Sequence, residues 1–306
     1  RINLDSSGFS REGVESIVVV ENELVKISFT NKGGQPKFVE LKNYRTTDGQ
    51  NKPVVLNASG TDRISYSINS NNQSTQIGDI YFKSGEISKN ADQSQTIRFV
   101  ASGKNGETVS HTFTLKPGSY LVDWNLTLNG ADKLLSNGVL NFAWTQTPQQ
   151  QETDVAYEKQ QTTVGFFEDK EFDYIQTKTE IKLEKETKWV SVAQQFFNTT
   201  LVAAGNFSSG DIKLTKQPED TTRKIAEVVA TLQAKVPVTA EVSFPMQVYY
   251  GPNDFQILKK QPIEDLDEMI NLGRDMYRFV RPINKYIVMP VFDFFRSFAG
   301  SMGIAI

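Results

Sequence analysis

The sequence predicts a mainly β protein, an antiparallel β-sandwich followed by C-terminal helices, and three observations carry this prediction. Apolar and polar residues alternate over most of the stretch from residue 16 to residue 250, which is the period of half-buried strands. Clusters of Gly, Pro, Asn and Asp separate the alternating runs at a spacing of roughly 8–14 residues, as in antiparallel sandwiches. After Tyr250 the apolar residues recur at threes and fours, which is typical of helices.

The strands are predicted from runs in which every second residue is apolar. The clearest of these in the N-terminal half are residues 24–30 (LVKISFT), 63–69 (RISYSIN) and 121–128 (LVDWNLTL). Residues 147–163 (TPQQQETDVAYEKQQTT) then break the alternation, and we expect them to form a long polar excursion from the sandwich.

The longest alternating run has eight apolar residues in one phase, from Val236 to Tyr250. Pro237 and Pro245 occupy the opposite phase. Because proline cannot donate to a strand ladder, we expect a free edge or a bulge at these two positions.

Two short helices are expected after this strand, over residues 252–273. The first has Pro252 in its first turn and Lys259 and Lys260 near its end, and the second ends at Gly273. Together they form a helical connector.

Residues 274–298 are predicted to form a basic amphipathic helix that lies in a membrane interface. A simple membrane span is disfavoured because charged side chains such as Lys285 and Asp293 are costly at a bilayer centre. The side chains expected at the interface are apolar or basic: Phe279, Ile283, Ile287, Val291, Phe295, Phe298, Arg278, Arg281, Lys285 and Arg296. The alternative that the residues leave open is a helix packed against its own domain.

Composition narrows the class of protein. The chain has 306 residues with 38% hydrophobic and 11% aromatic content, which is too apolar for a disordered chain. A net charge of −3 gives no basic surface for nucleic acid. The absence of cysteine excludes disulfides, thiolate metal sites and cysteine nucleophiles.

The sequence shows no catalytic, metal or cofactor site. His111 is the only histidine, and its phase within SHTFTL predicts a structural residue that faces the core or a strand end. The acidic clusters at 168–173 and 264–268 lack the spacing of a calcium loop, so we interpret them as solvated surfaces.

Five aromatic residues are candidates for a groove that binds an extended ligand or peptide. Aromatic rings line such sites, but more often they fill a sandwich core, and both readings stay open. The candidates are Trp124, Trp144, Trp189, Phe196 and Phe197.

Several segments resemble the YidC family of bacterial membrane protein insertases, and together they cover essentially the whole chain. The most specific are VYYGP (248–252), which resembles the end of that family's periplasmic domain, and RFVRPINK (278–285) with FFRSFAGSMGIAI (294–306) behind it. Two further segments resemble the first hairpin and an aromatic-rich strand of that domain: VENELVKISFTNKGG (20–34) and KWVSVAQQFFNTTLVA (188–203).

The resemblance implies a fold and a domain organisation. The implied fold is an antiparallel β-supersandwich of the galactose mutarotase-like class followed by C-terminal helices. The implied parts are a periplasmic sandwich (1–251), a short helical connector (252–273), an amphipathic interfacial helix (274–298) and the start of a truncated transmembrane span (299–306).

The resemblance also implies a function that is not enzymatic. The parent protein would insert and fold inner-membrane proteins, alone or with the Sec translocon, and this part would lie on the periplasmic side of the bacterial inner membrane. Its implied partners are membrane lipid, Sec components and nascent membrane proteins, without a cofactor, a metal or nucleic acid. The alternative is a periplasmic carbohydrate-binding or sugar-epimerising sandwich domain, because fold alone does not decide function.

Overall fold

The computed structural model describes residues 8–70, 73–217, 223–271, 283–291 and 294. The chain divides into two compact units between Asn253 and Asp254. The first unit contains all the described strands, and the second contains short helical segments. This arrangement agrees with the predicted class, an antiparallel β-sandwich followed by C-terminal helices.

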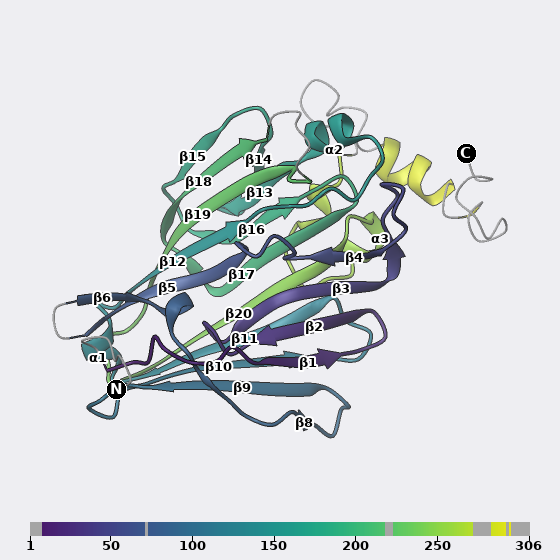
Figure 1. Cartoon of the computed structure of the whole chain (residues 1–306). Coiled ribbons are helices and arrows are strands. Elements are labelled where there is room, and N and C mark those ends of the chain that lie inside the picture. Colours follow the sequence, from purple (N-terminus) through teal and green to yellow (C-terminus); the bar gives the residue numbers. More distant parts are fainter. Residues whose placement is uncertain (1–7, 71–72, 218–222, 272–282, 292–293, 295–306) are drawn as a thin grey trace. The chain divides into compact units, whose positions relative to one another are not determined.

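A ten-stranded antiparallel sheet forms one layer of the first unit (Figure 1). Its long strands alternate inward apolar and outward polar residues, as in the buried–intermediate pattern of β11. Its strands are, in spatial order, β14 (Glu171–Ile175), β13 (Thr163–Glu168), β16 (Thr187–Ala193), β17 (Phe197–Phe207), β20 (Glu241–Pro252), β11 (Leu121–Asn129), β10 (Thr108–Leu115), β9 (Gln95–Ser102) and β7 (Lys83–Ser84), with β8 (Ser88–Lys89) also paired to β9.

Two smaller antiparallel sheets form the other layer. The six-stranded sheet contains β15 (Glu180–Leu183), β18 (Ser209–Lys216), β19 (Ala226–Lys235), β12 (Val139–Gln146), β5 (Arg63–Ser70) and β6 (Gln73–Gln76). The four-stranded sheet contains β1 (Ile17–Glu21), β2 (Val25–Thr30), β3 (Gln35–Arg45) and β4 (Pro53–Leu56). Three short helical segments lie between strands of the first unit: η1 (Ile77–Asp79), α1 (Ala131–Leu134) and α2 (Val155–Gln161).

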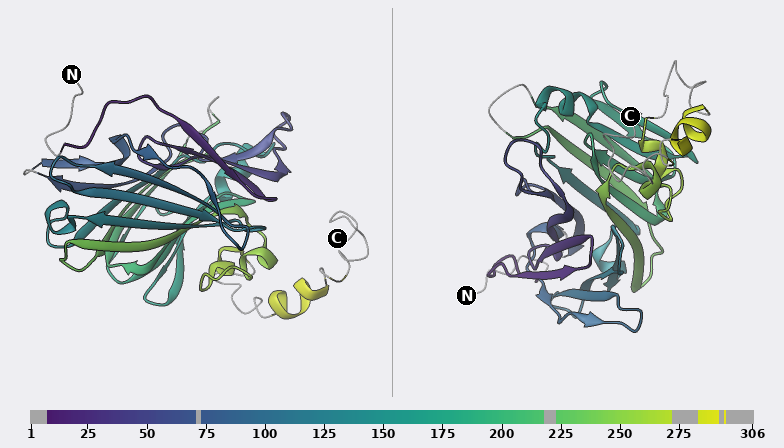
Figure 2. Two further views of the ribbon diagram at one scale, coloured as in Figure 1. Left: turned by 90° about the horizontal axis from the view of Figure 1, so that it is seen from below. Right: turned by 90° about the vertical axis from the view of Figure 1, so that its right-hand side faces the viewer.

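Both smaller sheets pack on the same face of the ten-stranded sheet. On β10, Phe113 lies 4.8 Å from Phe29 of the four-stranded sheet, measured between ring centroids. Two residues away on the same strand, His111 lies 5.7 Å from Tyr66 of the six-stranded sheet. Since residues i and i+2 share one face of a strand, the two smaller sheets cover one face together. Figure 2 (left) shows the purple four-stranded sheet as a layer over the teal and green strands.

The strand predicted for residues 236–250 is shorter than its alternation indicates. β19 ends at Lys235, a turn follows, and β20 begins at Glu241. Val238 in this turn is 68% exposed. The predicted strand included this turn because Val236 and Val238 have the same alternation phase as the apolar residues of β20.

Pro245 lies where the prediction of a free edge placed it. On one side of β20, Pro245 pairs with Asn125 of β11. On the other side, the pairing with β17 reaches Met246 and goes no further. A residue without an N–H therefore lies where the pairing with one neighbouring strand has ended.

The second unit begins with two short helical segments. α3 spans Phe255–Leu258 and begins later than predicted, because Pro252 still belongs to β20 and Asp254 is the N-cap. The Asp254 side chain accepts hydrogen bonds from the backbone N–H groups of Gln256 and Ile257. The next segment is a 3₁₀ helix, η2 (Leu266–Met269), and the predicted end at Gly273 lies outside the described residues.

Candidate functional site

The C-terminal segment of the second unit presents apolar side chains to solvent. Residues 283–291 are helical, and Asn284–Val288 (η4) form a π-helical turn in which the Met289 N–H donates to the Asn284 carbonyl oxygen. The exposed apolar side chains of this segment are Ile283, Tyr286, Ile287, Val288, Val291 and Phe294, each between 48% and 73% accessible. Apolar side chains that are this open, over so few turns, are typical of surfaces that meet a partner or a membrane.

Three of the predicted interface residues therefore lie together on one described helix. Ile283, Ile287 and Val291 recur every four residues and share one face. Lys285 belongs to the same helix. The other predicted residues lie outside the described part of the chain: Phe279, Phe295, Phe298, Arg278, Arg281 and Arg296. None of the described helices is both long and apolar enough to cross a bilayer.

The five aromatic groove candidates do not form a groove. Trp124, Trp144 and Trp189 are 2%, 1% and 0% exposed, so they fill the core of the sandwich. Phe197 is also buried, with its ring edge-on to another aromatic ring, whereas Phe196 is 46% exposed. Phe196 lies in the bend between β16 and β17, whereas Phe197 is the first residue of β17, and this separates the two phenylalanines.

His111 is a core residue held as a neutral imidazole, in agreement with its strand phase. Its Nδ1 lies 2.8 Å from the Gly34 carbonyl oxygen, which can only accept, so Nδ1 carries the proton. Its Nε2 lies 2.8 Å from the Tyr66 hydroxyl and accepts the hydrogen bond from it. Burial lowers the pKa of His111 to about 4. A histidine with both nitrogens satisfied and no access to solvent does not serve as a catalytic acid or base.

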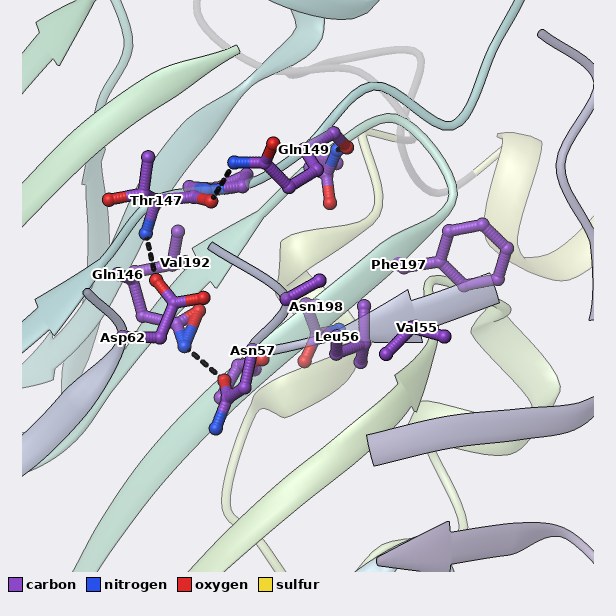
Figure 3. A pocket seen from close by; sticks show the side chains of 14 residues that line it. Val55, Leu56, Asn57, Asp62, Gln146, Thr147, Gln149, Val192, Phe197 and Asn198 are labelled. Carbon is purple, nitrogen blue, oxygen red and sulfur yellow. Dashed lines mark hydrogen bonds between the residues drawn. The ribbon is translucent and has the colours of Figure 1, made fainter. Parts of the chain in front are cut away.

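A polar cavity lies in the first unit where the end of β4 meets the end of β12 (Figure 3). Gln146 donates from Nε2 to the Asn57 Oδ1, and the Thr147 N–H donates to the Asp62 carboxylate. Burial raises the pKa of Asp62. The cavity measures about 10 Å³, which holds about one water molecule and excludes a sugar.

The polar excursion 147–163 is folded down onto the ten-stranded sheet by Glu158 of α2. The Glu158 carboxylate accepts from the backbone N–H groups of Gln151 and Glu152 at 3.1 and 3.2 Å. It also accepts from the Gln194 Nε2 at 2.9 Å. Burial raises the pKa of Glu158 to about 7 against these three donors.

A chain of side-chain hydrogen bonds continues from there into the sheet. Asn253 donates to the Gln194 carbonyl oxygen at 2.7 Å and accepts from the Asn198 side chain. Thr200 contacts the Asn198 Oδ1 at 2.9 Å and the Ser191 Oγ at 2.8 Å. Strand spacing in the sequence does not reveal such a network, because its members meet only when the strands pair. The network holds the polar segment 147–163 against the ten-stranded sheet.

No group of three or more His, Asp or Glu side chains that could hold a metal occurs among the described residues. The described part of the first unit therefore offers a water-sized polar cavity, two wider surface hollows of about 640 and 490 Å³, and a buried amide network. The second offers an exposed apolar helix.

Comparison with known proteins identifies the family. Residues 17–288 match the family model described as the YidC periplasmic domain. The chain is 31% identical to a membrane protein insertase YidC from Cytophaga hutchinsonii, over 94% of this chain and 47% of that relative. It is 26% identical to a membrane protein insertase YidC from Phocaeicola vulgatus, over 100% of this chain and 50% of that relative. The chain thus spans about half the length of the curated relatives it matches.

Solved structures resemble the fold at low identity. A galactose mutarotase related enzyme from Lactobacillus acidophilus matches with a TM-score of 0.49 and 9% identity, over 77% of this chain and 97% of that one. A putative aldose 1-epimerase from Escherichia coli matches with a TM-score of 0.45 and 8% identity, over 78% of this chain and 100% of that one. By sequence, the chain belongs to the YidC periplasmic domain family.

Proposed function

We propose that this chain is the large periplasmic domain of a membrane protein insertase in a bacterial inner membrane, where it assists the insertion and folding of membrane proteins. The observation that carries the proposal is the match of residues 17–288 to the YidC periplasmic domain. Relatives named membrane protein insertase YidC over 94% and 100% of the chain support it.

A complementation experiment tests this role in the cell. The full-length gene that encodes this chain replaces the insertase of a depletion strain, and insertion of an inner-membrane test protein is followed by protease protection. Restored protection is expected. Failure of the well-expressed full-length protein to restore insertion of any test protein would contradict the proposal.

The proposed role is not enzymatic. The relatives are named insertases, and the only histidine of this chain is buried and neutral. A sugar-epimerising site needs an accessible acid and base near neutral pH. The sugar alternative is not favoured either, because all three tryptophans are buried in the core and none can stack on a sugar ring.

We also propose that the C-terminal helix lies on the membrane surface. Ile283, Ile287 and Val291 expose a branched apolar face, and such a face gains free energy when it enters the headgroup boundary. Burial of apolar surface contributes about 25 cal/mol per Å². The basic residues of the predicted interfacial helix, Lys285 among them, are proposed to lie near lipid phosphates.

Liposome flotation tests the membrane contact. The double variant Ile287→Ser and Val291→Ser is expected to lose most of its binding to vesicles that contain anionic lipid. The control is Val238→Ser, because Val238 is also an exposed valine but lies in a turn of the first unit. Equal flotation of the double variant and the control would contradict the interfacial helix.

The partners proposed for this role are nascent membrane proteins and components of the Sec translocon. Both follow from membership of the insertase family rather than from a particular surface. Site-directed cross-linking in the full-length protein, from exposed positions of the first unit, is expected to capture a Sec component. Cross-links to nascent chains alone would leave an insertase that works without the translocon.

A further inference from the structure

The outer edge of β1 has unpaired backbone groups. The Asn31 N–H donates to the Ser16 carbonyl oxygen at 3.1 Å, and the Ser16 N–H donates to the Asn31 Oδ1 at 2.8 Å. Ser16 therefore faces β2. Because alternate residues of an antiparallel strand face the same neighbour, Ile17 and Val19 direct their N–H and C=O groups away from β2. β1 is the edge strand of its sheet, so those groups have no strand partner among the described residues.

The same edge exposes branched apolar side chains. Ile17 is 47% exposed and Val19 is 38% exposed, and Val14 just before the strand is 88% exposed. β-Branched side chains with free backbone groups form a template onto which another strand can add. Edge strands of natural proteins usually prevent this with charge, proline, a bulge or very short length.

Every other sheet edge in the described structure has one of these protections. β14 carries Glu171 and Asp173, and β15 carries Glu180 and Lys182. β7 and β8 have two residues each, β6 has only polar residues, and β4 has four residues and begins with proline. On β1 the outward positions are Ile17, Val19 and Glu21, and only Glu21, at the end of the strand, is charged. The other sheet edges are protected against strand addition, and the centre of the β1 edge is not. This difference indicates that β1 has a binding partner.

The occupant is better explained as a short peptide segment than as a second copy. The open edge is brief, because the Glu21 carbonyl oxygen already accepts from the Gln95 side chain at 2.6 Å. A contact of this length falls well below the total of about 1,200–2,000 Å² that a stable protein interface buries. Strand addition, in contrast, needs only main-chain hydrogen bonds and contacts for alternate side chains.

The ends of the edge define the charge of the occupant. Glu15 pairs with Lys37 at 2.7 Å, and Glu21 pairs with Lys42 at 2.7 Å. Both ends are thus neutral ion pairs, and the exposed centre is aliphatic. A segment with uncharged β-branched or aromatic residues at alternate positions matches this surface, since cross-strand apolar pairs stabilise it.

We propose that the β1 edge binds an extended, uncharged apolar segment of another polypeptide by strand addition. The proposal rests on the proposed function, because segments of this kind occur in membrane proteins before they are inserted. Beyond that function, the proposal names the surface that binds such a segment, the β1 edge, and the conformation of the bound segment, an extended strand.

The test measures binding of a short capped peptide of alternating Thr and Val to the 306-residue chain, with amide hydrogen exchange as the readout. Peptide binding is expected to slow exchange at Ile17 and Val19. Val19→Lys places a charge at the open edge and is expected to weaken binding about tenfold, on the scale of about 1.4 kcal/mol. Val238→Lys, at an exposed valine far along the chain, is the matched control and is expected to bind as the parent does.

A second variant protects the test against a general folding defect. The Val19 N–H points away from β2, so Val19→Pro leaves the β1–β2 ladder intact and removes only the outward donor. Val19→Pro is expected to weaken peptide binding as much as Val19→Lys does. Its unfolding midpoint is expected to stay close to that of the parent chain.

Three outcomes would overturn the proposal. These are no exchange protection at Ile17 and Val19 at saturating peptide, equal binding by Val19→Lys and Val238→Lys, and a concentration-dependent dimer in sedimentation that Val19→Lys abolishes. The last would assign the edge to a second copy. None of them depends on insertion activity, so a failure here is distinct from a failure of complementation by the full-length gene.

Discussion

The Nε2 atom of His111 lies 2.8 Å from the hydroxyl of Tyr66, and this hydrogen bond joins the ten-stranded sheet to the six-stranded sheet. Both side chains are buried, at 1% and 0% exposure. The imidazole bridges the layers because its other nitrogen donates to the Gly34 carbonyl oxygen near the four-stranded sheet. One neutral histidine therefore connects three sheets at the centre of the sandwich.

Acid is expected to destabilise the chain through His111. The folded-state pKa is about 4, below the ordinary value of 6.5, so the unfolded chain binds the proton more readily. The stabilisation is complete above pH 6.5 and is lost as pH falls toward 4, by about 3 kcal/mol. Urea unfolding at several pH values measures it.

His111→Asn isolates this contribution. The asparagine keeps a donor near Gly34 but leaves the Tyr66 hydroxyl without an acceptor, which costs about 1–3 kcal/mol at pH 7.5. The difference in unfolding free energy between parent and variant should shrink as the pH falls from 6.5 to 4. Adding Tyr66→Phe should recover part of the loss at pH 7.5. A difference that stays constant over this pH range would contradict a neutral buried histidine.

Glu158 is expected to act in the opposite direction. Burial raises its folded-state pKa to about 7 from an ordinary 4.5, so the folded chain holds the proton more tightly. Its stabilising contribution is complete below pH 4.5 and is lost as pH rises through 7, by about 3 kcal/mol. In the parent chain this partly cancels the effect of His111 between pH 4.5 and 6.5.

Glu158→Gln removes the titrating carboxyl group. The pH dependence of stability that is due to His111 should then no longer be partly cancelled. Relative to the parent, the variant should gain unfolding free energy as the pH rises from 4.5 to 8, measured by the same urea series. Glu180→Gln is the control, because Glu180 is an exposed carboxylate on β15 and not a neighbour of Glu158. Equal pH profiles of the two variants would show that Glu158 is ionised throughout and held by its three donors.

Gly138 should tolerate alanine much less than Gly106. Both have positive φ, +66° and +87°, so alanine costs about 1–2 kcal/mol at either position. A Cβ at Gly138 would also collide with the Val236 carbonyl oxygen, whereas Gly106 has nothing within 4 Å of that position. Thermal unfolding should therefore show Gly138→Ala about 2 kcal/mol less stable than Gly106→Ala. A similar loss for both would mean that the turn relaxes away from Val236.

Much of the fold follows from local pattern, and the failures have local causes. Alternation located β2, β5 and β11 because one face of each strand is buried and the other meets solvent. The same rule extended β20 too far, since apolar residues in a turn cannot be told from strand residues by phase. It gave no strand order, because the pairing of β11 with β20 joins residues more than a hundred positions apart.

The candidate sites divide in the same way. Ile283, Ile287 and Val291 were predicted from the fixed interval of a helix face, and they are exposed on one described helix, while their contact with a membrane stays a prediction. Gln194, Asn198 and Asn253 were missed because their partners, on α2 and on other strands, are distant in the sequence and meet only in the folded chain. Composition also gave no means to separate an aromatic core from an aromatic groove, which depends on the packing of two layers.

Trp144 and Phe196 provide the test of that last distinction. Trp144 is 1% exposed on β12, so Trp144→Ala should cost about 3–5 kcal/mol of unfolding free energy through lost burial and the cavity left behind. Phe196 is 46% exposed, and Phe196→Ala should change stability by about 1 kcal/mol or less. Urea unfolding of both variants, with calorimetric titration of simple sugars as a second readout, separates the two roles. The parent chain could bind a sugar, and Trp144→Ala could lose that binding with only a small loss of stability. This outcome would show that Trp144 lines a ligand groove.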